Sequence, residues 1–428
     1  MSENSKKLHF DLAVIGGGIA GMSAAVRAYD CGVSDIAIFE INDSLGGVLG
    51  QCIHSGFGLH TFGEELTGPE YSARFEKMVS DRGIRVFLRS PVTELRPDRT
   101  MTVVSRDFGI LDVSANAVVI AQGCRERPAG AIGLEGTRPA GVITAGTAQK
   151  YINIDGYMVG KRAVILGSGD IGLIMARRLT LEGAKVLCVC ELMPYSNGLR
   201  RNIVQCLDDY GIPLRLSCTV VGLEGRGRLT GVRVAPVDPD TLKPDLERTE
   251  LIECDTLLLS VGLIPETGLA ADAGALLGSN RGLSVDDGRE TTIPGVFACG
   301  NVVQVHDLVD YVAEEGRTAG NSAAGFLSGI RPASGQKAGT LPGEGVSYVV
   351  PETVSLPAGE AELFFRVRRV FRDSTVVCRC GKTVLAQKKR AVMLPGEMEK
   401  LTVPVSRIHG GDTLTVEVVP AGKREENR

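Results

Sequence analysis

The stretch FDLAVIGGGIAG, residues 10–21, joins an apolar run to a glycine-rich turn. The run Phe10–Ile15 predicts a buried strand, and the Ala-rich segment Ile19–Tyr29 predicts a helix. A second apolar run, Ile36–Glu40, supplies another strand. Strand, turn, helix and strand within roughly thirty residues predict a βαβ unit, and therefore an α/β fold with parallel strands.

The glycines of this turn, Gly16, Gly18 and Gly21, follow the G-x-G-x-x-G pattern. Glycine permits the tight turn, the approach of the backbone to a pyrophosphate, and the packing of helix on strand. Glu40 stands 19 residues after Gly21, where a carboxylate can accept hydrogen bonds from ribose hydroxyls. A glycine-rich turn without a ligand is the alternative, but strand, turn, helix and acid together favour a dinucleotide site.

The same pattern returns near the middle of the chain. Gly167, Gly169 and Gly172 follow the apolar run 163–166, and the next expected strand ends at Glu191, again 19 residues after the third glycine. We therefore expect a second Rossmann-like domain with a second dinucleotide site. A nucleotide fold that has lost its ligand is the alternative.

The acid at the end of the second expected strand bears on the choice of nicotinamide cofactor. Glu191 would repel a 2′-phosphate and so favours NAD(H) over NADP(H). Arg200 and Arg201 follow closely in the sequence and leave this preference open.

Composition and charge exclude several classes of protein. The formal net charge is −4 and the sequence pI about 5.9, with no run of Lys or Arg that would suit nucleic acid. No apolar run reaches the length of a membrane span, and the start of the chain lacks a signal-peptide core, so we expect a cytoplasmic location. The 11 cysteines, an odd number, then predict reduced thiols.

The composition changes after Ile330. A linker is marked by Pro332, Gly335, Gly339, Pro342, Gly343 and Gly345. Strand-like alternation follows in residues 363–370, 375–378 and 414–418. These segments predict a small all-β domain at the carboxyl end.

Further motifs occur in a fixed order around the two glycine turns. Leu45-Gly46-Gly47 follows the first acid, Ala121-Gln122-Gly123 closes an apolar strand, and Gly300-Asn301 follows another strand. Together these motifs resemble the two-dinucleotide-binding flavoprotein superfamily, which includes thioredoxin reductase, glutathione reductase and NADH oxidases. The resemblance covers about residues 8–330 and implies bound FAD and NAD(H).

The resemblance also implies domain limits. Residues 1–157 and 259–335 would form an FAD domain, split by an inserted NAD(H) domain at 158–258, with the β domain at 340–428. The first glycine turn, Gly46, Gly47, Ala121 and Gly123 would then contact FAD.

Other implied contacts concern the ends of FAD. Val92 would lie near the adenine, and Gly300-Asn301 near the ribityl and phosphate groups. Asn301 replaces the usual aspartate of the superfamily, but an amide can still form hydrogen bonds. Backbone N–H groups of Leu308 and Val309, at a helix expected from about Asp307, would face the flavin N1–C2 edge and stabilise reduced flavin.

A paired cysteine, which disulfide reductases of this superfamily carry beside the flavin, is missing near the Gly46-Gly47 turn. Cys52 stands alone there, and Cys188 and Cys190 are alternate strand residues that we expect to pack. Disulfide reduction is therefore disfavoured. Cys378-Arg-Cys380 offers too few ligands for a metal, and we expect no metal site.

Cys52 and His54 could form a thiolate and imidazole pair, and His306 could likewise act in catalysis. Packing of Gln51 and Cys52 against the flavin edge is favoured over this redox chemistry, because a nucleophile needs a demonstrated partner.

Two longer stretches, residues 46–71 and 123–149, look like the FAD/NAD subunit that accompanies bacterial glycerol-3-phosphate-dehydrogenase-like enzymes. They are similar, more distantly, to subunits of opine oxidase, hydrogen cyanide synthase and dye-linked proline dehydrogenase. The resemblance implies a hetero-oligomer with a partner FAD-dependent dehydrogenase subunit. A small cysteine-rich subunit is an optional third component of such a complex. A stand-alone NADH oxidase or disulfide reductase, and a noncatalytic flavin-bearing scaffold, are the alternatives.

Overall fold

The computed structural model describes residues 6–330, 336–356, 359–406 and 408–420. The chain forms two compact units. The first unit contains Met1–Cys124 and Pro265–Arg428, and the second contains Arg125–Ile264. Each unit has its own hydrophobic cores.

A seven-stranded sheet organises the first unit, in the order β5-β2-β1-β8-β7-β6 with β19 beside β8. Its strands are β1 (Lys6–Ile15), β2 (Ile36–Phe39), β5 (Arg85–Phe87), β6 (Val92–Leu95), β7 (Thr100–Ser105), β8 (Gly109–Ile120) and β19 (Val296–Ala298). β1 runs parallel to β2 and β8, whereas β7 runs antiparallel to β6 and β8. The apolar run predicted for the first strand is buried in the centre of this sheet, as parallel strands require.

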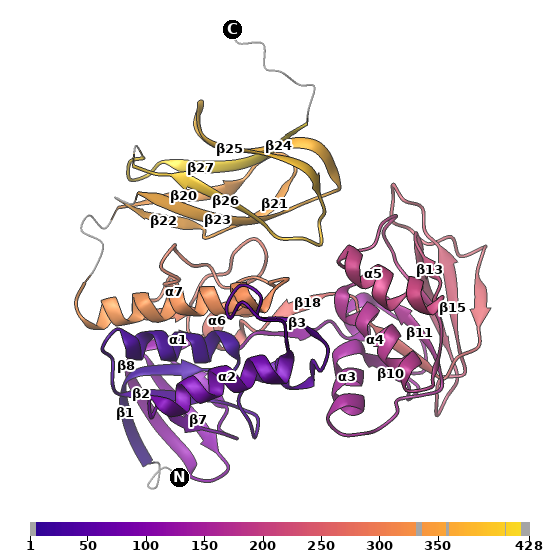
Figure 1. Cartoon of the computed structure of the whole chain (residues 1–428), viewed down its shortest axis with the longest axis horizontal. Coiled ribbons are helices and arrows are strands. Elements are labelled where there is room, and N and C mark those ends of the chain that lie inside the picture. Colours follow the sequence, from indigo (N-terminus) through magenta and orange to yellow (C-terminus); the bar gives the residue numbers. More distant parts are fainter. Residues whose placement is uncertain (1–5, 331–335, 357–358, 407, 421–428) are drawn as a thin grey trace. The chain divides into compact units, whose positions relative to one another are not determined.

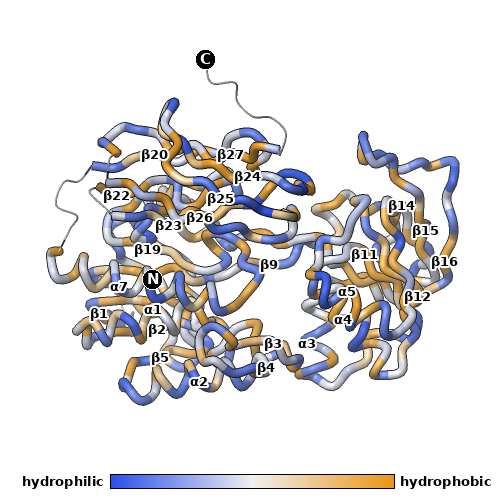
Figure 2. Tube along the Cα trace, turned by 45° about the horizontal axis from the view of Figure 1, so that its top comes forward, coloured by the Kyte–Doolittle hydropathy of each residue, from blue (hydrophilic) through white to orange (hydrophobic). Residues whose placement is uncertain are grey.

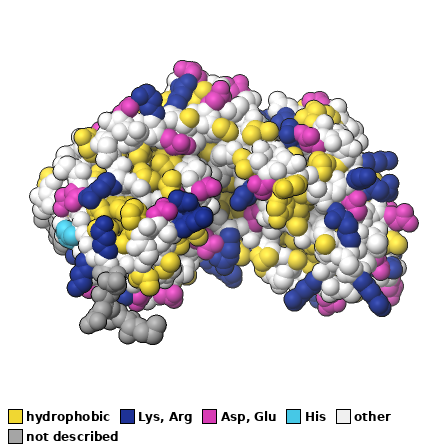
Figure 3. Space-filling model, turned by 90° about the horizontal axis from the view of Figure 1, so that it is seen from below, with side chains coloured by type: hydrophobic (Ala, Val, Ile, Leu, Met, Phe, Trp, Pro, Cys, Tyr) yellow, Lys and Arg dark blue, Asp and Glu magenta, His cyan; other side chains and the backbone are white. Residues whose placement is uncertain are grey.

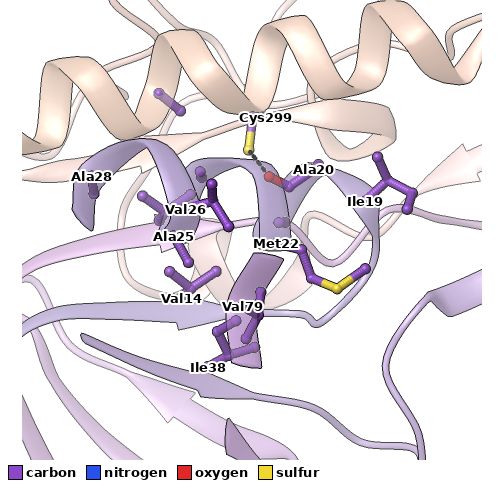
Figure 4. Close-up of a cluster of buried hydrophobic side chains, with 14 of the residues drawn as sticks. Val14, Ile19, Ala20, Met22, Ala25, Val26, Ala28, Ile38, Val79 and Cys299 are labelled. Atoms are coloured by element: carbon purple, nitrogen blue, oxygen red, sulfur yellow. Dashed lines mark hydrogen bonds between the residues drawn. The ribbon is translucent and has the colours of Figure 1, made fainter. Parts of the chain in front are cut away.

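Helices α1 (Ile19–Asp30), α2 (Gly68–Asp81) and α7 (Val309–Leu327) contribute to the core on this sheet. α1 and α7 lie side by side (Figure 1) because small residues face each other. A Cβ on Gly316 would stand only 2.4 Å from the carbonyl oxygen of Ala20. Figure 4 shows the α1 side chains meeting Val14 and Ile38 of the sheet.

The second unit contains a five-stranded parallel sheet in the order β10-β17-β11-β12-β13. These strands are β10 (Val142–Thr144), β17 (Thr256–Leu259), β11 (Arg162–Leu166), β12 (Lys185–Cys190) and β13 (Leu214–Arg215). An antiparallel sheet is formed by β14 (Cys218–Glu224), β15 (Gly231–Pro236) and β16 (Glu250–Ile252), and the helices are α3 (Ala145–Asn153), α4 (Asp170–Leu181) and α5 (Arg200–Cys206). Hydrophobic colour follows β11, β12 and β14 in Figure 2, in line with their burial.

The second unit begins earlier than the domain limit predicted at residue 158. β10 pairs with β17 and α3 packs in the same core, so residues from Arg125 onward belong to this unit. The prediction failed here because a three-residue strand at 142–144 gives no periodic signal.

A sandwich of two sheets forms the carboxyl-terminal part of the first unit. One sheet contains β22 (Thr353–Leu356), β20 (Gln336–Pro342), β27 (Thr413–Pro420), β24 (Phe371–Cys380) and β25 (Thr383–Met393), and the other contains β21 (Val346–Val350), β23 (Glu360–Val367) and β26 (Glu399–Pro404). The predicted linker is partly wrong, because Gly339 and Pro342 lie in β20. Pro332 and Gly335 of that linker lie outside the described residues.

The remaining elements are short. They are β3 (Ser55–Phe57), β4 (Leu66–Thr67), β9 (Cys124–Glu126), β18 (Leu263–Pro265) and α6 (Gly268–Asp272). No helix in the described part of the chain is long and apolar enough to cross a membrane. The fold is therefore α/β, with two Rossmann-like domains and a carboxyl-terminal β sandwich.

Candidate functional site

The first glycine turn joins β1 to α1, and its three glycines have different surroundings. Gly16 has a φ of +107°, and a Cβ there would stand 2.4 Å from Ala121 O. A Cβ on Gly21 would stand 1.9 Å from Gly16 O, so this glycine lets the helix pack on the turn. A Cβ on Gly18 would meet no protein atom within 4 Å. Gly18 is therefore the glycine that faces the space in which a ligand can approach the backbone.

Glu40 follows β2 and is buried beside this turn. Its Oε2 accepts a hydrogen bond from Gly17 N at 2.6 Å, and its Oε1 accepts from the backbone and side-chain nitrogens of Asn42 at 2.8 and 2.7 Å. The carboxylate thus fixes the turn, and Oε2 keeps one acceptor position. Sequence reasoning found Glu40 but missed Asn42, whose only signal was its place two residues after the acid.

The Gly46-Gly47 motif lies directly on the first turn. Gly46 N donates to Gly17 O at 2.9 Å, and a Cβ on Gly47 would stand 3.3 Å from the Cα of Gly18. Both glycines have positive φ, at +97° and +57°. Side chains at these positions would therefore strain the turn and narrow the space in front of Gly18.

Gly300 lies just after β19 in the sequence and packs against the first turn of α1. A Cβ on Gly300, whose φ is +78°, would stand 2.8 Å from the Ala20 Cβ. Its backbone N–H donates to Glu315 Oε2 at 2.7 Å. The structure therefore brings together the first glycine turn, the Gly46-Gly47 turn and the Gly300 turn, which lie far apart in the sequence.

Asn301 takes part in hydrogen bonds within the protein. Its Oδ1 accepts from His306 N at 3.0 Å, and its Nδ2 lies 3.5 Å from Cys124 Sγ. The amide therefore shapes the segment between this turn and α7, a role that the predicted ribityl contact did not include.

His306 is buried in a network of charged groups. Its Nε2 lies 2.9 Å from Glu315 Oε2, and Arg289 Nε lies 2.9 Å from Glu315 Oε1. The side chains of His306, Glu315 and Arg289 are 1%, 2% and 6% exposed. Burial raises the pKa of Glu315, but His306 and Arg289 outweigh it and hold this pKa below its ordinary value. This environment makes His306 a structural partner of Glu315, and its predicted catalytic role stays a prediction.

Several buried polar atoms near these turns have no hydrogen-bond partner among the described residues. They are Gln122 Oε1, both side-chain amide atoms of Gln304, and His306 Nδ1. Such atoms are normally satisfied in folded proteins. A ligand with many hydrogen-bonding groups, such as the ribityl and isoalloxazine parts of FAD, fits this set. Sequence reasoning missed Gln304, since burial alone distinguishes it.

The beginning of α7 is held by α2 and by the segment before it. Leu308 is the extended N-cap and Val309 the first helical residue, so the helix begins two residues after the predicted Asp307. Thr61 N and Tyr71 Oη donate to Asp310 Oδ1 at 3.1 and 3.3 Å. The first N–H groups of α7 are thereby fixed in direction, although their predicted flavin contact stays a prediction.

The surroundings of Cys52 disfavour the thiolate form, and its predicted catalytic role stays a prediction. Its Sγ donates to Val48 O at 3.4 Å, and burial raises its pKa to about 12. Gln51 ends the short helix before it, and the His54 ring lies tilted against the Phe57 ring, with the ring centroids 5.0 Å apart. Packing, the favoured reading of Cys52, agrees with this environment.

Val92, the predicted neighbour of the adenine, is buried at the start of β6 within a hydrophobic core. Cys188 and Cys190 are buried too, and Cys190 lies 3.9 Å from Cys188 and 3.7 Å from Cys218, sulfur to sulfur. Within the described residues no group of three or more His, Cys, Asp or Glu could hold a metal ion.

The second glycine turn, between β11 and α4, repeats the first. Gly167 has a φ of +97°, and Cβ atoms on Gly167 and Gly172 would stand 2.1 and 2.8 Å from Ser260 O and Gly167 O. A Cβ on Gly169 has more room, with Ser260 Oγ nearest at 3.3 Å. Glu191 is buried and accepts hydrogen bonds from Ser168, which lies in this turn, at 2.9 and 2.5 Å.

The segment before α5 lies on this second turn. Asp170 Oδ1 accepts from Leu199 N at 2.8 Å and from Asn202 Nδ2 at 2.6 Å. These bonds place Arg200 and Arg201, at the start of α5, in the same unit as Glu191. Glu191 and the two arginines therefore all remain candidates for setting the preference between NAD(H) and NADP(H).

On the face drawn in Figure 3, Lys and Arg side chains alternate with Asp and Glu. This mixture of charges on the face drawn agrees with the small net charge.

Comparison with known proteins gives a consistent result. A family model described as Pyridine nucleotide-disulphide oxidoreductase matches residues 10–321. Hydrogen cyanide synthase subunit HcnB of Pseudomonas protegens is 27% identical over 282 residues, which are 61% of this chain and 58% of HcnB. The glutamate synthase (NADPH) small chain of Mycobacterium tuberculosis is 28% identical over 349 residues, 74% of this chain and 67% of the relative. The T. acidophilum thioredoxin reductase structure superposes with a TM-score of 0.61 and 25% identity, covering 76% of this chain and 99% of the other.

Proposed function

This chain belongs to the pyridine nucleotide-disulphide oxidoreductase family of flavin-dependent enzymes that use NAD(P), and we propose that it is one subunit of a heteromeric dehydrogenase. In this proposal the first unit holds FAD and the second unit holds NAD(H). The subunit exchanges hydride or electrons between NAD(H) and a partner flavoprotein. The relatives named as a subunit and as a small chain support the heteromeric part.

The observation that carries the proposal is the convergence of three glycine turns at the start of α1, where Gly18 has an open side. Glu40 would accept a hydrogen bond from the adenosine ribose, the N–H groups around Gly18 would face the pyrophosphate, and the buried amides of Gln122 and Gln304 would reach the flavin half. Bound FAD would supply the electron-transfer chemistry. The protein would contribute position and electrostatics, above all the N–H groups at the start of α7.

The organic substrate would be oxidised on the partner subunit. An anionic substrate needs cationic anchors beside the flavin, but residues 46–58 and 300–311 contain no Arg or Lys. Two arginines do lie close to this region, but each is already paired with a carboxylate. Arg289 pairs with Glu315, and Arg366 pairs with Asp307. We propose glycerol 3-phosphate or a similar small hydroxylated acid as the substrate of the complex, on the strength of the resemblance of residues 46–71 and 123–149.

Three measurements test this function. The purified chain should release FAD on denaturation, and NADH should bleach the bound flavin faster than NADPH in stopped flow, because Glu191 disfavours a 2′-phosphate. Glycerol 3-phosphate should bleach the flavin only when the partner subunit is present. A folded preparation without FAD would refute the proposal, and bleaching of the isolated chain by the substrate would make it a complete dehydrogenase.

A stand-alone NADH oxidase or disulfide reductase is the second candidate. The raised pKa of Cys52 argues against disulfide chemistry, but rapid oxygen consumption with NADH alone would favour an oxidase. A chain that binds FAD but is reduced by neither nicotinamide would be the noncatalytic scaffold. A cytoplasmic location and a small cysteine-rich third subunit are further parts of the proposal, which isolation of the native complex would test.

A further inference from the structure

The β sandwich contacts the segment that joins the flavin turn to α7. β23 contributes Ala361, Leu363, Phe365 and Val367 to the core of the sandwich. Because strand residues alternate between faces, Phe364 and Arg366 lie on the opposite face. Phe364 is nonetheless 7% exposed, and the Arg289 guanidinium of the Rossmann-like part and Lys400 of β26 both lie over its ring. One face of β23 is thus turned toward the proposed flavin site.

Arg366 is the main contact. Its Nη2 donates to Val305 O at 2.9 Å and to Asp307 Oδ1 at 2.5 Å. Its other nitrogens bond within the sandwich, Nε to Tyr348 Oη at 3.2 Å and Nη1 to Gly396 O. The guanidinium group therefore has a rigid base in the sandwich and holds the segment that ends at the N-cap of α7.

Asp307 is held from two sides. Its second carboxylate oxygen accepts from Met398 N, in the loop before β26, at 2.6 Å. The side chains of Arg366 and Asp307 are 15% and 18% exposed, so the pair is largely shielded from water. Asp307 immediately precedes Leu308, the N-cap of α7. This ion pair therefore holds the start of α7 from the sandwich side, in addition to the bonds that Asp310 accepts from Thr61 and Tyr71.

A second set of contacts links the sandwich to the Gly300 turn. Asp286 bonds to Lys337 of β20 at 2.7 Å, and Asp287 Oδ1 accepts from Ser355 N of β22 at 2.9 Å. Arg289, which follows closely, lies over the Phe364 ring at 5.9 Å and bonds to Glu315. Glu315 in turn holds Gly300 N.

We propose that the β sandwich is part of the flavin site, and that Arg366 is a positioning residue that sets flavin affinity and redox potential by fixing Asp307 and the start of α7. The inference rests on the proposed binding of FAD by the first unit. Without Arg366, the segment 303–308 would lose its support and the N–H groups of α7 would lose their alignment. Because these groups stabilise the negative charge of reduced flavin, misalignment would lower the reduction potential.

The test compares Arg366→Gln with Arg379→Gln. Arg379 forms a similar ion pair with Glu417, whose side chains are 19% and 26% exposed, but that pair joins β24 to β27 within the sandwich. We expect Arg366→Gln to weaken FAD binding about tenfold, in the usual range of coupling between sites, and to shift the flavin potential to more negative values. Arg379→Gln should leave both quantities unchanged. FAD binding is measured by fluorescence on adding FAD to the apoprotein, and the potential by dye-coupled reductive titration.

Three further variants separate positioning from folding. Asp307→Asn keeps the size of the side chain and should lower the potential as Arg366→Gln does, and the double variant should be no worse than either single one. Arg366→Lys should recover part of the FAD affinity. Folded Arg366→Gln and Asp307→Asn proteins with wild-type affinity and potential would overturn the inference while leaving the proposed function intact. Absence of FAD from the wild-type protein would overturn both.

Discussion

Gly18 and Gly21 belong to the same turn but should respond differently to the same substitution. Gly18 has a φ of −73°, and a Cβ there meets no protein atom, so Gly18→Ala should leave the melting temperature of the apoprotein unchanged. FAD binding should fall sharply, because the methyl group would point toward the pyrophosphate. Fluorescence titration with FAD and a melting curve of the apoprotein measure the two effects.

Gly21→Ala is the matched variant. Its Cβ would stand 1.9 Å from Gly16 O, and overpacking of this kind costs about 1–3 kcal/mol. We therefore expect lower stability of the apoprotein itself. If Gly18→Ala also retained full FAD affinity, the pyrophosphate would not lie at this turn.

Cys52 provides a second prediction for a single residue. Because burial raises its pKa to about 12, the thiol should stay neutral at pH 8 and resist alkylation. Cys31 is exposed and should react with iodoacetamide first, as peptide mass spectrometry can measure. Cys52→Ser should keep flavin reduction by NADH. Rapid labelling of Cys52, together with loss of activity in the serine variant, would instead support a redox thiol.

Helix α7 depends on a buried acid for its contact with the Gly300 turn. The pKa of Glu315 is lowered in the folded protein, since its charged partners outweigh burial. Its contribution to stability is therefore present above its unfolded pKa, near the ordinary glutamate value of 4.5, and is lost as pH falls through the lower folded pKa. We expect Glu315→Gln to cost about 3–5 kcal/mol at pH 7, because it leaves Arg289 buried without a counter-ion.

The difference between wild type and Glu315→Gln should shrink below pH 4.5. Thermal melting of both proteins between pH 7 and pH 3.5 would measure it. Glu64→Gln is the control, because the Glu64 and Arg74 side chains are 59% and 36% exposed and such pairs contribute about 0–1 kcal/mol. An undiminished difference at low pH would show that the charge of Glu315 is not what stabilises the turn.

At the scale of the whole molecule, the second unit has the properties of an inserted domain. It is continuous in sequence, has its own cores, and its ends meet, since Arg127 N donates to Gly262 O at 3.0 Å. We expect residues 125–264, expressed alone, to melt cooperatively and to bind NADH more tightly than NADPH. Isothermal titration would measure both affinities. If the folded fragment bound neither nucleotide, the second unit would be a nucleotide-binding fold that has lost its ligand.

Much of the fold could be predicted from local sequence signals. The strand, turn and helix around Gly16 and around Gly167 lie where they were expected, because burial of a parallel strand demands a continuous apolar run. The limit at Arg125 and the strand β20 could not be predicted. Their residues are few, or rich in glycine and proline, and their strands exist through pairing with distant partners.

The sequence by itself determined the two glycine turns, the acids Glu40 and Glu191, and the order of the motifs, because each depends on spacing along the backbone. Only the tertiary structure decided that Glu315 holds Gly300, that burial raises the pKa of Cys52, and that Arg366 reaches Asp307. Ion pairs and desolvation depend on which distant side chains meet and how deeply they are buried. Spacing along a chain carries no information about either until the chain has folded.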